Sequence, residues 1–122
     1  VLIVILIVAI RSCVGISSQK VSQELKETSL YYVQTIKANF GKTQKIVSPD
    51  SLPKSEVFDY SIQKGRFVAK LKEDVDKCNK GNIWSISPSV KGLFKKTLSI
   101  YRKPPQDSAC QQILPDFKSI GK

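Results

Sequence analysis

The sequence has 122 residues, and none of them is histidine. Histidine is the commonest general base and metal ligand, and it is the usual pH switch near neutrality. Its absence excludes Ser-His-Asp and Cys-His catalytic arrangements. The sequence also lacks a glycine-rich phosphate-binding loop. We therefore expect a protein that is not an enzyme and that uses no cofactor and no metal.

Acidic residues are also scarce, with 10 Asp and Glu against 20 Lys and Arg, which gives a net charge of +10. No acid occurs between residues 77 and 106. If that region is helical, Lys91, Lys95 and Arg102 fall on one face, with Lys96 and Lys103 close by. These five residues are the candidate contact for a polyanion or a partner. An anionic glycan or a membrane surface is the expected polyanion, and nucleic acid is not expected, because the aromatic and basic interleaving of single-strand binders is missing.

Long apolar runs are absent except at residues 1–10, which are all apolar and are followed by Arg11. A membrane-spanning helix needs about 20 apolar residues, whereas the core of a secretory signal has about 7–15. Cys13 and Gly15 are small enough to direct cleavage before Ile16. The pattern thus predicts a signal peptide at 1–15, without the usual basic segment ahead of it, and a single secreted, extracellular domain at 16–122.

The same run resembles the apolar start of a type IV pilin stalk. The Phe and Glu of that family's start are not present, and Arg11 would interrupt the stalk helix inside the membrane, where a charge is costly. The resemblance implies a pilin-like subunit, and this remains an alternative to secretion.

Cysteine occurs three times, at Cys13, Cys78 and Cys110. Removing the signal removes Cys13, and an even pair in a secreted chain indicates one disulfide, Cys78–Cys110. Closing the loop between these residues is worth about 3–4 kcal/mol in the chain-entropy model.

Residues 16–40 show the clearest helical periodicity, since their apolar side chains fall within an arc of about 120°. Ser17 or Ser18 can cap the start, and Gly41 can end the helix. Residues 54–64 are ambiguous. Alternation at Phe58, Tyr60 and Ile62 fits a strand, but the flanking cap, proline and glycine signals favour a short helix.

Two further segments also show helical spacing of their apolar residues. Residues 66–78 are predicted to form a helix that ends at Cys78, and residues 90–102 a helix that is apolar on two sides. Asp107 or Ser108 can cap a last short turn that carries Cys110. Trp84 is expected to pack over the disulfide.

The predicted fold is all-α, a bundle of three or four helices with one disulfide. The alternative is an α+β fold with a hairpin at 57–71. The favoured function is a small, basic, non-catalytic secreted effector or signalling factor of the reproductive-tract, salivary, venom or immune type, which binds a receptor or another protein. The alternatives are a membrane-active, antimicrobial or glycan-binding protein that uses residues 91–103, and the pilin-like subunit.

Overall fold

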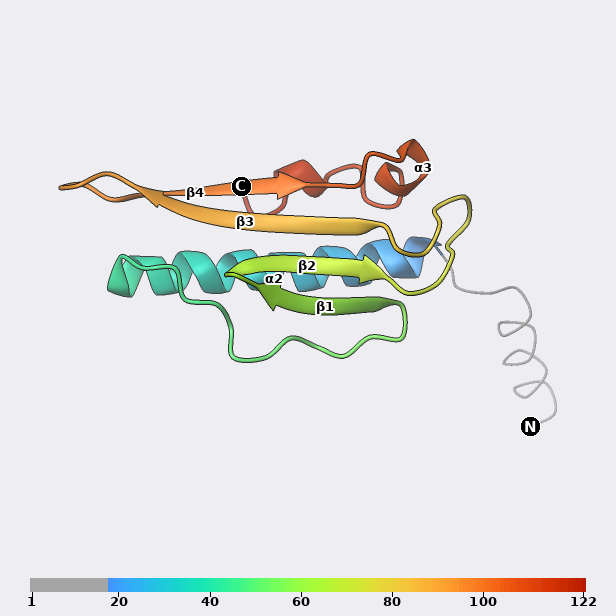
Figure 1. The fold of residues 1–122 in the computed structure, drawn as a ribbon, viewed down its shortest axis with the longest axis horizontal. Helices are drawn as coiled ribbons and strands as arrows, with labels where there is room; N and C mark the ends of the chain where they lie inside the picture. Colours follow the sequence, from blue (N-terminus) through green and yellow to red (C-terminus); the bar gives the residue numbers. More distant parts are fainter. Residues whose placement is uncertain (1–17) are drawn as a thin grey trace.

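The computed structural model describes residues 18–122, so the predicted signal at 1–15 lies outside the described residues. One long helix, α2 (Ser18–Thr43), lies along a four-stranded sheet (Figure 1). The strands are β1 (Phe58–Gln63), β2 (Arg66–Leu71), β3 (Ile83–Lys91) and β4 (Thr97–Lys103). Each strand pairs antiparallel with the next, in the order β1-β2-β3-β4. The fold is α+β, and the predicted all-α bundle is wrong.

The helix predicted at 16–40 is confirmed in type and in its buried face. Its buried residues recur at helical spacing along one side of α2: Val21, Leu25, Thr28, Ser29, Tyr32, Val33 and Ile36. Gly41 does not end the helix, which continues to Thr43. The chain leaves the helix at Gln44, which adopts a left-handed conformation (φ 59°) and whose amide donates to the Phe40 carbonyl at 2.9 Å.

Residues 54–64 were predicted to be helical, and this is wrong, because β1 and β2 form a hairpin over residues 58–71. Lys64 and Gly65 form its two-residue turn, and both have positive φ, as a tight hairpin connection requires. The alternation of Phe58, Tyr60 and Ile62 was therefore the correct signal. The alternative fold, α+β with a hairpin at 57–71, is the one observed.

The helix predicted at 66–78 is also wrong, since β2 ends at Leu71 and a loop follows. Phe67, Ala69 and Leu71 are buried on one side of β2, with the period of two that a strand imposes. Val68 is also buried, although it lies on the opposite face of the sheet, and this produced a false helical spacing. Cys78 lies in the loop, where it pairs with Val75 in an isolated bridge.

The helix predicted at 90–102 is a second hairpin. Strands β3 and β4 pair from Ser85↔Lys103 to Lys91↔Thr97, and residues 92–96 connect them. The apolar residues that showed helical spacing come from both strands and from the turn between them. Gly92 has a φ of 107°, and a Cβ atom there would lie 2.2 Å from the Lys95 carbonyl oxygen. This turn therefore requires glycine.

The C-terminal segment returns to the helix and sheet and is fixed there by the disulfide. The Cys78–Cys110 bond is present, which confirms the predicted pairing. Asp107 caps the short helix α3 (Ser108–Gln111), because its carboxylate accepts from the Ala109 amide at 2.9 Å. After it come buried apolar residues and the 3-10 turn η1 (Phe117–Ser119). The buried residues of this segment are Cys110, Ile113, Leu114, Phe117 and Ile120.

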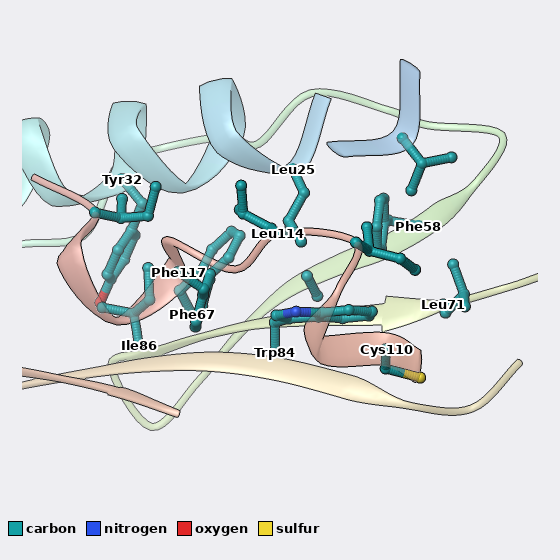
Figure 2. Packing of buried hydrophobic residues seen from close by; sticks show 14 of the residues in the cluster. Leu25, Tyr32, Phe58, Phe67, Leu71, Trp84, Ile86, Cys110, Leu114 and Phe117 are labelled. Carbon is teal, nitrogen blue, oxygen red and sulfur yellow. The ribbon is translucent and has the colours of Figure 1, made fainter. Parts of the chain in front are cut away.

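The core lies between α2 and the inner face of the sheet (Figure 2). Trp84 of β3 is fully buried there, and its ring meets that of Phe58 edge-on at 5.7 Å. Figure 2 shows Trp84 and Cys110 in the same buried cluster. The core is therefore aromatic at its centre and is closed at one end by the disulfide.

Candidate functional site

The structure separates the five predicted contact residues into two groups. Lys91, Lys95 and Lys96 lie at the tip of the β3–β4 hairpin, whereas Arg102 and Lys103 lie at the other end of β4. Five strand residues at about 3.4 Å each place Arg102 about 17 Å from Thr97. The predicted single stripe on one helix face is therefore wrong, because these residues are on two strands and a turn.

The hairpin tip, defined as residues 91–96, combines the three lysines with two unburied apolar side chains. Leu93 is 92 % exposed and Phe94 is fully exposed. All six tip residues are exposed. An exposed leucine alone is ordinary, but an adjacent phenylalanine on a projecting turn is typical of a contact surface.

The tip continues an apolar strip that begins in the core. Leu98 and Ile100 are half-buried against the core cluster, and their partners Val90 and Pro88 on β3 are half-buried as well. In Figure 1 this hairpin extends past the end of α2. The helix therefore covers the inner face near Trp84 and leaves the outer part of the hairpin uncovered.

The second group has a structural role. The Arg102 guanidinium donates to the Ile120 carbonyl and, at 3.0 Å, to the Ile100 carbonyl. Partial burial lowers the pKa of Arg102. Arg102 therefore ties η1 to β4.

A groove beside Arg102 is lined by further cations, namely Lys103, Lys118 and Lys122, together with Pro104, Pro105, Gln106 and Gln111. Lys118 and Lys122 could not be predicted as part of this groove, because nothing in their spacing shows that the C-terminal segment returns to β4. Leu93 and Phe94 were not predicted as surface residues either. The signal for a turn was Gly92, since glycine is unfavourable within a helix.

A second hollow lies at the β1–β2 turn and is lined by Gln63, Lys64, Gly65, Arg66, Ser87 and Pro88. Behind it the Tyr32 hydroxyl donates to the Gly65 carbonyl at 2.7 Å, and burial raises the pKa of Tyr32 to about 12. The raised pKa keeps the hydroxyl neutral at pH 7, and its proton is donated to the backbone. This hydroxyl therefore anchors the turn.

Residues 18–122 contain no group of three or more Cys, Asp or Glu side chains placed to hold a metal ion. Within the same range, no helix has both the length and the apolar character needed to cross a membrane.

No known family is shown. The chain matches no family model, no curated protein and no solved structure. The proposed function is therefore based on the architecture and on the surfaces described above.

Proposed function

We propose that the chain is a pilin-like subunit, in which a folded α+β domain is carried on a helix that leads back to an apolar N-terminal segment. The observation that carries the proposal is α2. It is one uninterrupted helix of 26 residues that begins at Ser18, shortly after the apolar run 1–10. The sheet covers one side of this helix, and the other side stays exposed.

A stalk subunit needs both a covered and an exposed side on this helix. One face of the helix holds the globular domain, and the remaining faces stay free for other copies. On α2 the exposed residues are mostly polar, and Tyr31, at 46 % exposure, adds aromatic area among them. Aromatic side chains within a polar surface are enriched where proteins associate.

The disulfide agrees with a domain outside the cytoplasm, because structural disulfides form and persist in oxidising compartments. The Phe and Glu of the pilin start do not occur in residues 1–10. The proposal is therefore supported by the architecture and by the apolar run together.

Intact-mass and membrane-fractionation measurements on the full chain test the proposal. A pilin-like subunit keeps residues 1–15 and sediments with membranes. Leu6→Asp should release it, since a charge within an apolar segment is costly in a membrane. Val47→Asp, at a 44 % exposed site after α2, also places a charge on an apolar residue and is the control that should stay bound. A mature protein beginning at Ile16 would overturn the proposal.

Crosslinking tests assembly separately from anchoring. In a Cys13→Ser background, Tyr31→Cys on the exposed side of α2 should give dimers and higher multimers in membranes with a bismaleimide. Lys77→Cys, in the loop between β2 and β3, should give far fewer multimers. Equal crosslinking at the two positions, or monomers only, would contradict a helix-packed assembly.

The second candidate is the secreted, non-catalytic protein that binds a receptor or another protein. It is supported by the disulfide and by the small residues Cys13 and Gly15 ahead of Ile16. The bundle fold that suggested a helical signalling factor is not observed. Recovery of the chain from the medium with Ile16 at its N-terminus favours this candidate, and retention of residues 1–15 rejects it.

A further inference from the structure

The tip of the β3–β4 hairpin is built to hold two apolar side chains out in solvent. The connection from Lys91 to Thr97 is a closed turn, since these two residues are paired across the hairpin. Gly92 (φ 107°) fits it because a larger residue would collide with the Lys95 carbonyl. The turn conformation thus places Leu93 and Phe94 at the most projecting point, where Leu93 is 92 % exposed and Phe94 fully exposed.

The charge around this apolar pair has one sign. Lys91, Lys95 and Lys96 are all exposed, and the sequence has no acid from Lys77 to Gln106. A surface that meets this tip must therefore accept two apolar side chains and supply negative charge around them. The interface of an anionic bilayer does both, because acyl chains lie directly beneath anionic headgroups.

The small area of the tip favours a bilayer over a protein as its partner. A stable protein–protein contact buries about 800 Å² on each side and involves about 20–30 residues. Six tip residues on a narrow turn fall short of that. Insertion of one or two apolar side chains into a lipid interface has no such minimum, because affinity there grows with buried apolar area plus charge attraction.

We propose that the hairpin tip is a membrane-contact site, which inserts Leu93 and Phe94 into the interface of an anionic bilayer while Lys91, Lys95 and Lys96 bind headgroup phosphates. Figure 1 shows the tip at the end of the molecule opposite to the start of α2. A chain held at its N-terminal end therefore presents the tip away from the point of attachment. The proposal does not depend on the pilin-like function.

The test compares sedimentation of the full chain with vesicles of phosphatidylcholine and with vesicles of phosphatidylcholine and phosphatidylglycerol, at low and high salt. The apolar run contributes similarly to both vesicle types, so the ratio of the two partition coefficients reports the cationic contact. Each lysine near an anionic surface contributes about fivefold. Replacing Lys91, Lys95 and Lys96 with Gln should therefore lower the ratio about 100-fold, and high salt should lower it in the wild type.

The matched control replaces Lys72, Lys77 and Lys80 with Gln. These three lysines are exposed in the loop at the opposite end of β3, and the change in net charge is the same. The control should leave most of the ratio intact. If the two triple variants lose the same amount, binding is a general effect of net charge and the proposal fails.

The apolar pair is tested by Phe94→Ser, which should weaken binding to anionic vesicles about tenfold through lost apolar burial. Tyr101→Ser on β4, where the tyrosine is 66 % exposed, is the control and should have little effect. Hydrogen exchange localises the contact. Amides of residues 91–97 should be protected by anionic vesicles and not by neutral ones. Equal protection by soluble heparin would assign the tip to a glycan, and no protection would overturn the proposal.

Discussion

Two core tyrosines should respond in opposite directions to loss of the hydroxyl group. Tyr32 donates to the Gly65 carbonyl at 2.7 Å, and its ring packs 5.2 Å from that of Phe67. The Tyr60 ring packs between Phe58 at 5.5 Å and Phe67 at 5.8 Å. Its hydroxyl oxygen is buried near the Thr28 side chain and forms no hydrogen bond of full geometry within residues 18–122. Changing either residue to Phe removes one oxygen and leaves the ring contacts in place.

The magnitudes follow from these two environments. A typical hydrogen bond contributes about 1 kcal/mol net, so Tyr32→Phe should lower the free energy of unfolding by about that amount. A buried hydroxyl without a partner costs about 1–3 kcal/mol, so Tyr60→Phe should raise the stability by about 1 kcal/mol or more. In urea unfolding at pH 7, with a slope of about 1–3 kcal/mol/M, the two midpoints should move apart by about 1 M.

Alkaline pH supplies an independent measurement on the same two variants. Burial raises the pKa of Tyr32 to about 12 and raises that of Tyr60 as well. An unfolded tyrosine ionises near pH 10. The stability is therefore complete below about pH 10 and falls as the pH rises toward 12, because the unfolded tyrosines lose their protons while the buried ones keep them. Each Phe variant should show a shallower loss. Destabilisation by Tyr60→Phe at pH 7 would refute the reasoning, because it would mean that the hydroxyl has a partner.

Three further substitutions test the packing of the C-terminal segment and of α2. The double variant Cys78→Ala, Cys110→Ala should lose about 3–4 kcal/mol of unfolding free energy with a larger urea slope, and an unchanged midpoint would contradict the loop-closure argument. Gly121→Ala should cost about 1–3 kcal/mol, because its Cβ would lie 2.5 Å from a methyl of buried Val33 at a φ of +70°. Gly41→Ala, which meets nothing within 4 Å inside α2, should instead gain about 0.5–1 kcal/mol by thermal unfolding.

Helix α2 could be predicted because its pattern is local in the sequence. The disulfide could be predicted because it follows from the number of cysteines. The buried apolar residues of α2 repeat from Val21 to Ile36, over about four turns, and no strand pattern fits that length. Cys78 and Cys110 were paired because Cys13 was assigned to a predicted signal, and the pairing is observed. For the helix and for the disulfide, one sequence pattern was clearer than the alternatives.

The strands could not be separated from short helices on periodicity alone. In β2 the buried set includes Val68, which interrupts strict alternation. From Val90 to Arg102 the apolar residues of two strands and of the turn between them repeat by coincidence at helical spacing. Runs of six to nine residues contain too few repeats to distinguish a period of 2 from one of 3.6.

The lysines of the hairpin tip were among the residues predicted from the sequence, but their arrangement and the exposed Leu93 and Phe94 were not. The absence of acids from Lys77 to Gln106 correctly marked a basic region, but the helical geometry grouped Arg102 with the tip lysines. Arg102 instead holds the C-terminal segment. Phe94 falls within the predicted helix 90–102, where an apolar residue is expected to be buried, and the five-residue turn that is observed removes that expectation.

The contact between the C-terminal segment and α2 determines when the chain can finish folding during synthesis. Gly121 lies against Val33, and Phe117 and Ile120 complete a core that begins at Val21. A chain emerging from a ribosome in sequence order makes α2 first and the residues that close over its apolar face last. Until then the partly made chain has an incomplete core. The Cys78–Cys110 bond can also form only at this late stage, because Cys110 is among the last residues to be made.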